Sequence, residues 1–231
     1  GEALNLTKLD IKGLGKAKYI LKEGGTLGDL YTTSNLRFND NGYVEVDKNG
    51  NLLMTDEGED IYLGSVFPNH NLAWRNDFSY KGINLGVLFT ARLGGVCYSA
   101  TQANLDLYGV SEASAAARDA GGVLINGREM VDAQKWYQAI GSQSGLPQYY
   151  LYSATNVRLQ ELSLGYTFPR KWFRNKLGLT VSFVGRNLWM IYCKAPFDPE
   201  AVASTGLNYQ GIDYFMMPSM RNLGFNVKFQ F

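Results

Sequence analysis

The stretch RNLGFNVKFQF, residues 221–231, alternates strictly between apolar and polar positions. Its apolar side chains all fall on one parity: Leu223, Phe225, Val227, Phe229 and Phe231. Successive side chains of an extended chain point to opposite faces, so this stretch predicts a β-strand with one apolar and one polar face. Such a strand fits a soluble sheet packed on a core, or a membrane barrel with lipid outside and water inside. The ends of soluble domains are usually polar, so alternation up to a final aromatic favours the barrel.

The composition suits a β-rich chain. The 231 residues include 26 glycines and 15 tyrosines, and aromatic residues make up 13%, as expected for many strands, tight turns and interfacial aromatic side chains. The net charge is +1, from 22 basic and 21 acidic residues, so no charge excess points to nucleic acid or to an anionic membrane surface. No apolar run reaches the ~20 residues of a membrane helix, whereas barrel strands need only ~9–11 alternating residues.

Four more stretches alternate in the same way, at residues 71–80, 83–93, 161–168 and 179–191. Short turns join them in pairs, at Lys81-Gly82 and at residues 169–178. The other connections are long, at about 95–150 and 192–218. Connections of this length are uncommon in a compact soluble domain but ordinary for the extracellular loops of an outer-membrane barrel. The asymmetry predicts an all-β chain that forms part of an antiparallel transmembrane β-barrel.

Five strands cannot close a barrel, because the smallest membrane barrels have about eight and an open edge in lipid leaves backbone groups unpaired. We therefore expect residues 71–231 to be the C-terminal strands of a longer barrel. The first residues show no signal-peptide pattern.

Two kinds of local structure are expected outside the barrel strands. Residues 1–70 are expected to form an extracellular loop region with strand pieces near 4–9 and 18–22. A small hairpin meander is signalled by Asn41-Gly42 and Asn49-Gly50, because Asn-Gly favours the positive φ of type I′ turns. Within the long loop, residues 111–120 and 131–140 have helical character, with Ser111 as an N-cap.

A different fold class remains open, namely a secreted soluble β-sandwich that acts as a glycan-binding module with aromatic loops as its platform. The two hypotheses differ in where one set of apolar side chains lies. A barrel exposes them to lipid, and a sandwich buries them in its core. The residues that discriminate are Leu85, Val87, Phe89, Val181, Phe183, Phe225, Val227 and Phe229.

The sequence does not indicate an enzyme. His70 is the single histidine, with no second histidine and no nearby cysteine to share a metal or to act with it in catalysis. Asp198-Pro199-Glu200 offers two carboxylates without an identifiable partner acid or nucleophile, so we expect this segment to anchor a loop. Cys97 and Cys193 are too few for a disulfide framework. We therefore predict no catalytic residue, no cofactor and no metal site.

Four stretches resemble the C-terminal part of the SusC/RagA-type TonB-dependent outer-membrane transporters. They are LGSVFP with WRNDFSYKG (residues 63–68 and 74–82), NVRLQELSLGYTFP (156–169), VGRNL with DPE (184–188 and 198–200), and residues 218–231. The resemblance implies a barrel of about 22 strands in the outer membrane of a Gram-negative bacterium. It also implies an N-terminal plug, contact with TonB through that upstream part, and a SusD-type surface lipoprotein as a lid. Such a transporter imports glycans or peptides.

Two groups of residues are candidate sites in that setting, besides Phe231, which resembles the terminal aromatic that the barrel-assembly machinery reads. The first group has the parity of the polar face, and it either lines a solute path or pairs internally and with the plug as barrel lining: Arg75, Asp77, Arg92, Glu161 and Arg186. The second group consists of loop aromatics that either stack on sugar rings or peptide side chains, or pack the loop against the lid: Trp136, Tyr137, Tyr149, Tyr150 and Tyr152.

Overall fold

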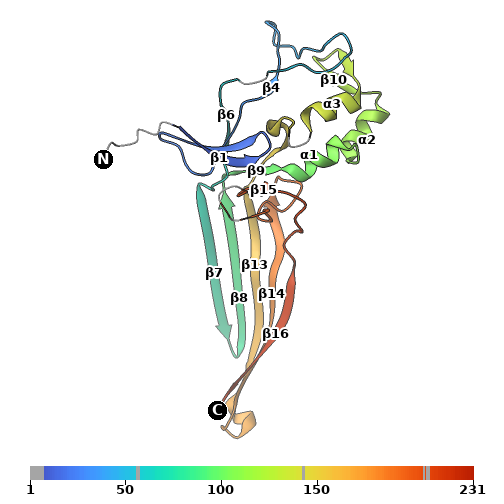
Figure 1. Cartoon of the computed structure of the whole chain (residues 1–231). Coiled ribbons are helices and arrows are strands. Elements are labelled where there is room, and N and C mark those ends of the chain that lie inside the picture. The colour runs from blue at the N-terminus through green and yellow to red at the C-terminus, as the bar shows by residue number, and fades with distance from the viewer. Residues whose placement is uncertain (1–7, 56–57, 142–143, 205, 207–208) are drawn as a thin grey trace, which may run out of the picture. The chain divides into compact units, whose positions relative to one another are not determined.

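Figure 1 shows the chain as a computed structural model. The structure describes residues 8–55, 58–141, 144–204, 206 and 209–231. These residues form two compact units, each drawn from three segments of the chain. Unit 1 takes its described residues from Gly1–Phe67, Gly95–Tyr152 and Val202–Met216. Unit 2 consists of Pro68–Gly94, Ser153–Ala201 and Met217–Phe231.

Unit 2 is built on a five-stranded antiparallel sheet in the order β16-β14-β13-β8-β7, the long strands of Figure 1. Its strands are β7 (His70–Tyr80), β8 (Ile83–Leu93), β13 (Asn156–Phe168), β14 (Gly178–Cys193) and β16 (Asn222–Gln230). They are 9 to 16 residues long, so each reaches the ~9 residues that a tilted membrane strand needs at least. All five alternating stretches of the sequence are thus confirmed as strands of one sheet.

The pairing register separates two faces of this sheet. On one face, apolar side chains stand opposite one another in a row across all five strands: Phe78, Leu85, Leu164, Phe183 and Phe225. The neighbouring row on the other face is polar or glycine: Ser79, Asn84, Gly165, Ser182 and Asn226. A slip of one residue in any strand would move its apolar side chains to the polar face, so the alternation specifies the register.

The apolar face is exposed rather than packed. Phe78, Phe183 and Phe225 expose 60%, 51% and 80% of their surface. A soluble sandwich would bury these side chains beneath a second sheet. Their exposure argues against the sandwich, and it is what a lipid-facing sheet requires.

Tight connections join the strands at one end of the sheet. Lys81 and Gly82 both have positive φ, 47° and 90°, the backbone of a two-residue type I′ turn whose twist matches that of the flanking strands. The hairpin of β13 and β14 closes through the short helix η2 (Arg170–Phe173). Every connection to unit 1 leaves from the opposite end of the sheet, beside His70, Leu93, Asn156, Cys193 and Asn222.

Strand β13 is longer than the alternation predicts, because it starts at Asn156 rather than at residue 161. A β-bulge explains the difference. Leu159 pairs with Phe89 and Glu161 with Leu88, so Gln160 is an extra residue without a counterpart on β8. The insertion interrupts the period-two pattern, and it places Arg158, opposite Thr90, on the polar face.

Unit 1 contains several short strands. Its largest sheet has the order β1-β2-β3-β6, formed by β1 (Lys8–Leu14), β2 (Ala17–Lys22), β3 (Asp29–Thr32) and β6 (Ile61–Ser65). The remaining strands are β4 (Asn35–Leu36), β5 (Met54–Thr55), β9 (Val96–Ser99), β10 (Val123–Ile125), β11 (Glu129–Val131), β12 (Leu151–Ser153) and β15 (Ile212–Asp213). The expected strand piece at 18–22 is confirmed within β2, whereas the piece at 4–9 lies mostly outside the described residues.

The hairpin meander between β4 and β5 is confirmed, with bridges between Phe38 and Val44 and between Val46 and Leu52. Its turns are not of type I′. Only the glycines have positive φ, 77° at Gly42 and 76° at Gly50, as in a turn that is followed by a left-handed glycine. Side chains at the turn starts, Asn39 and Asp47, accept hydrogen bonds from backbone N–H groups further along the turns and so select this conformation instead.

Three short helices lie in unit 1: α1 (Ala100–Leu107), α2 (Glu112–Asp119) and α3 (Ala133–Ile140), with the 3₁₀ helix η1 (Pro147–Tyr150) after them. Ser111 caps α2 as expected, since its hydroxyl accepts from the Ser114 N–H at 3.0 Å. Helix α1 was not expected from the sequence. None of the helices within the described chain has the length and apolarity that crossing a membrane requires. The core of the unit holds Tyr19, Leu30, Tyr98, Leu146 and Ile212.

Candidate functional site

Four of the five charged residues predicted for the polar face form one ladder of alternating charge. Arg75 Nε donates to Asp77 Oδ2 at 2.8 Å, and Arg75 Nη1 lies 3.4 Å from Glu161 Oε1. Arg186 Nε donates to the other oxygen of Glu161 at 3.0 Å. Glu161 is therefore shared by two guanidinium groups that come from the strands β7 and β14. The residues pair with one another, and whether they line a solute path or serve as barrel lining stays a prediction.

The fifth residue, Arg92, lies on the same face but nearer the end of the sheet that connects to unit 1. It stands opposite Asn71 and Asn156 in the register. Together with Asn71, Thr90, Gln160 and Glu200 it lines an open depression of about 500 Å³. The polar face thus carries a paired charge ladder along its middle and a mixed polar depression near one end.

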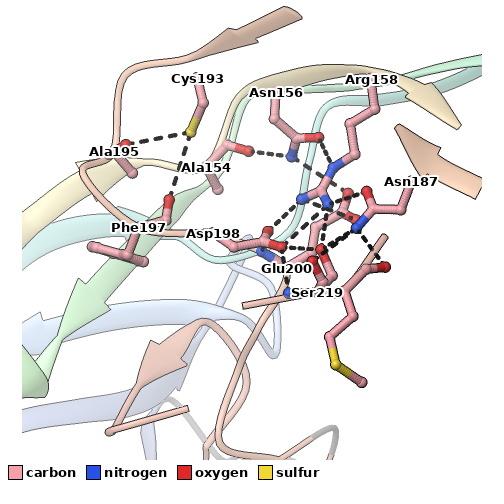
Figure 2. A network of polar contacts seen from close by, with 11 residues as sticks. Ala154, Asn156, Arg158, Asn187, Cys193, Ala195, Phe197, Asp198, Glu200 and Ser219 are labelled. Atoms are coloured by element: carbon pink, nitrogen blue, oxygen red, sulfur yellow. Dashed lines mark hydrogen bonds and ion pairs between the residues drawn. The ribbon is translucent and has the colours of Figure 1, made fainter. Parts of the chain in front are cut away.

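A buried polar network, shown in Figure 2, lies at the loop end of the same face. Arg158, only 2% exposed, is its centre: both terminal nitrogens donate to the Asp198 carboxylate, at 3.2 Å for Nη1 and closer for Nη2. Its Nε donates to Asn156 Oδ1 at 3.0 Å. Glu200 Oε2 lies 3.4 Å from Nη2. The two-pronged contact of a guanidinium with a carboxylate is a strong and directional one.

The network fixes three segments that are far apart in the sequence. Asp198 accepts hydrogen bonds from the hydroxyl and the backbone N–H of Ser219, which lies three residues before the start of β16. The amide nitrogen of Asn187, a residue of β14 in the left-handed conformation with φ 52°, donates to the Ser219 backbone oxygen at 3.0 Å. Asp198 therefore anchors its loop, as the sequence predicts, and the same contacts hold the beginning of the last strand in place.

The electrostatics of Asp198 follow from these contacts. Burial by itself raises the pKa of the carboxyl, but hydrogen bonds from Arg158, Ser219 and the Glu200 N–H outweigh burial and lower its pKa from 3.8 to about 2. Asp198 is thus a carboxylate throughout the physiological pH range. A depressed native pKa means that the ionised form stabilises the fold above pH 4 and that this stabilisation is lost on acidification.

Acid should therefore remove a defined part of the stability. We expect the free energy of unfolding of the full-length protein to lose about 2 kcal/mol between pH 4 and pH 2 through Asp198 alone. The measurement compares wild type with Asp198→Asn in denaturant titrations from pH 7 to pH 2. The difference between the two proteins should be largest above pH 4 and should shrink by that amount towards pH 2. A difference that does not change with pH would show that the ionised carboxylate contributes nothing.

Sequence reasoning missed Arg158 as a site residue. Its partners Asn187, Asp198 and Ser219 lie 29, 40 and 61 residues away, so no local spacing signals them. The one available signal was the pair of motifs that contain them, residues 156–169 and 198–200. The structure shows that these motifs meet through an ion pair.

Comparison with known proteins adds independent findings. No family model matches the chain. It is 26% identical over 198 residues to TonB-dependent receptor P3 of Formosa agariphila, an alignment that covers 81% of this chain and 19% of that receptor. Two structures share its fold: the RagAB peptide transporter, with TM-score 0.56 and 20% identity, and the RagAB peptide importer in the open-open state, with TM-score 0.57 and 17% identity. They cover 98% and 99% of the chain, which spans 24% of each.

The chain resembles the SusC/RagA-type TonB-dependent receptors. The similarity in sequence and the similarity in fold point to the same class of protein, although the chain spans only about a fifth of the length of the curated relative. The location is the outer membrane of a Gram-negative bacterium.

The predicted loop aromatics lie in unit 1 and differ in accessibility. Tyr150 is 3% exposed and belongs to the core, and burial followed by the Asp106 charge raises its pKa. Trp136 packs against that core and makes an edge-to-face contact with Tyr149 at 6.0 Å between ring centroids. Tyr149 is 41% exposed, so part of its ring is accessible to solvent. The role of this group in contacting a ligand or lid stays a prediction.

The histidine, the two cysteines and the C-terminal phenylalanine are the remaining residues that the sequence analysis considered. His70 begins β7 and pairs with Leu93. Cys97 and Cys193 form no disulfide within the described chain. Among the described residues, no group of three or more His, Cys, Asp or Glu side chains is placed to hold a metal ion. Phe231 is almost fully exposed, and its part in barrel assembly stays a prediction.

Proposed function

We propose that this chain is the C-terminal barrel portion of a TonB-dependent outer-membrane nutrient importer. It works by gated passage of a solute and performs no bond chemistry. The barrel has about 22 strands, of which the sheet of unit 2 supplies the last five. The transported solutes are glycans or peptides, and the fold neighbours, a peptide transporter and a peptide importer, support the peptide class.

One observation carries this proposal: the sheet has membrane-length strands with an exposed apolar face and a polar face whose charges are paired. A strand in lipid must satisfy its backbone within the sheet and present apolar side chains outward. The row from Phe78 to Phe225 does so. The ladder of Arg75, Glu161 and Arg186 then faces the aqueous lumen, where paired charges are tolerated because water and the plug surround them.

The partners follow from the same proposal. The open edges of β7 and β16 are completed by strands from the rest of the same transporter, since unpaired edges are costly in lipid. A plug fills the lumen, and TonB acts through the N-terminal part of the receptor. A SusD-type surface lipoprotein serves as the lid, and unit 1 with its exposed aromatics such as Tyr149 is the part of this chain that meets the lid or the solute.

The orientation of the sheet can be tested with cysteine labelling of two neighbouring residues. In the full-length protein with Cys97 and Cys193 replaced by alanine, Ser182→Cys should react with a charged, membrane-impermeant thiol reagent. Phe183→Cys should react only with a lipid-soluble reagent, because its side chain faces hydrocarbon. The experiment is done on intact outer membranes. Equal labelling of both positions by the charged reagent would contradict a lipid-facing surface.

The transport function itself is tested by uptake. Deletion of the full gene should abolish TonB-dependent uptake of labelled oligopeptides or oligosaccharides, and the wild-type gene should restore it. Collapse of the proton gradient should stop uptake in the restored strain. Uptake that is unaffected by the deletion for both solute classes would refute nutrient import, even if the labelling result confirms the orientation of the sheet.

A further inference from the structure

A polar cavity of about 190 Å³ lies within unit 1 where the three helices meet. It is lined by the C-terminal end of α1 and by side chains from all three helices, among them Asp106, Ser114, Arg118, Gln134, Tyr137 and Gln138. The volume far exceeds the roughly 10–15 Å³ that one water molecule needs. The proposed transport function makes no use of this cavity.

Asp106 is the unusual group in the lining. Its side chain is buried, with the residue 5% exposed. The carboxylate accepts a hydrogen bond from Gln102 Nε2 at 2.9 Å, which is a neutral donor, and no Lys, Arg or His of the described chain forms an ion pair with it. Buried carboxylates are normally paired with a cation, because removing an isolated charge from water is costly. Within the described residues Asp106 is therefore surrounded by neutral hydrogen-bonding groups, Gln102 and Tyr150, without a cation in ion-pair contact.

The groups around Asp106 are suited to a cation that carries several N–H donors. Burial first, and the Asp106 charge second, raise the pKa of the Tyr137 hydroxyl, which lines the cavity and so lies within electrostatic range of the carboxylate. The backbone carbonyls at the end of α1 add a partial negative charge. The Tyr137 hydroxyl and these carbonyls can accept, together with Asp106, the three hydrogens of one ammonium group.

Arg118 does not take the place of that cation. Its Nη1 donates to the Gly109 oxygen at 2.8 Å, beyond the end of α1, and the residue is exposed. The guanidinium thus lies at the edge of the cavity, where its charge opposes the entry of another cation. A divalent metal ion fits the site poorly, because hard cations take six or more oxygen ligands, usually with several carboxylates, and Asp106 is the single carboxylate of the lining.

We propose that this cavity binds a primary ammonium group, as carried by the side chain of a lysine in a peptide. The ammonium contacts the Asp106 carboxylate, and its alkyl chain occupies the remaining volume towards Tyr137. The site is separate from the polar face of the sheet. If the cavity does not bind an ammonium group, the proposed import function is unaffected. If the protein does not import nutrients, the ammonium site is unaffected.

The test uses the full-length protein in detergent and titrates it with Nα-acetyl-lysine methylamide, followed by calorimetry or saturation-transfer NMR. The neutral control ligand is Nα-acetyl-norleucine methylamide, and norleucine methylamide presents an α-ammonium instead. We expect the lysine compound to bind and the neutral one not to bind. Asp106→Asn, which keeps the shape of the side chain, should weaken binding roughly tenfold or more. Asp119→Asn, which removes an exposed carboxylate of α2 outside the lining, should leave binding unchanged.

A second variant keeps the proposal open to refutation if Asp106→Asn does not fold. Arg118→Gln removes the opposing charge at the edge of the cavity and should strengthen lysine binding about fivefold. Equal binding of the lysine and norleucine compounds, or binding that Asp106→Asn leaves intact, would overturn the proposal. Weaker binding in Arg118→Gln would overturn it as well. Tighter binding of the α-ammonium compound would assign the site to a peptide amino terminus rather than to a lysine side chain.

Discussion

Replacing Arg158 by methionine is expected to lower the free energy of unfolding of the full-length protein by about 3–5 kcal/mol. The substitution removes the guanidinium that both oxygens of Asp198 contact, and it leaves a buried carboxylate without a counter-charge. Asn156 and Ser219 lose a donor at the same time. The effect is measured as the shift of the denaturant midpoint at pH 7, with the slope of the transition checked for constancy.

Arg186→Met is the matched control for this prediction. Arg186 lies on the same face and also contacts a carboxylate, that of Glu161, but its side chain is 65% exposed. Exposed ion pairs contribute about 0–1 kcal/mol, so this variant should remain close to wild type. Adding Asp198→Leu to Arg158→Met should recover part of the loss, because the unpaired charge is then gone. Equal losses in the two single variants would contradict the special role of the buried pair.

Phe183→Lys is expected to cost about 2–4 kcal/mol when the full-length protein folds into phospholipid vesicles, because the ammonium is placed in hydrocarbon. Phe183 stands in the middle of the apolar row, between Leu164 and Phe225. Stability is measured by urea titration of the folded protein in vesicles, and insertion is followed in cells by the amount of receptor in the outer membrane.

The neighbouring Ser182→Lys serves as the control. Ser182 has the opposite parity and pairs with Gly165 and Asn226 on the polar face, so the new ammonium points to water and should cost no more than about 0.5 kcal/mol. A larger loss of stability in Ser182→Lys than in Phe183→Lys would place the polar face in lipid. If the protein is soluble without detergent and both variants are as stable as wild type, the sheet does not lie in a membrane.

Much of the sheet could be predicted from period-two alternation, because each of its faces meets a different solvent. The row through Phe225 and the ladder through Glu161 both follow from parity alone. Alternation fails at Gln160, where the bulge inserts one residue and hides the first part of β13. The Asn-Gly dipeptide in turn predicts the wrong turn type at Asn41-Gly42, since the Asn39 side chain selects a different backbone there.

The packing of unit 1 and the Arg158 network could not be predicted, since both depend on contacts between distant segments. The parallel pairing of β9 with β15 joins Tyr98 to Ile212, and neither strand is long enough to show a periodic pattern. The residues of the core come from three separate stretches of the chain. For the same reason Asp198 could be assigned to a loop from its sequence, whereas its partner on β13 could not be named.

All crossings between the two units occur at one end of the sheet, at the boundaries Phe67/Pro68, Gly94/Gly95, Tyr152/Ser153, Ala201/Val202 and Met216/Met217. Insertions, deletions and recombination within unit 1 therefore leave the register of the long strands unchanged. Unit 1 can therefore diverge, or be exchanged as a whole, without a change in the five-stranded sheet. Divergence among related receptors should accordingly concentrate in the three segments of unit 1, and Arg158, Asp198 and Ser219 should vary least.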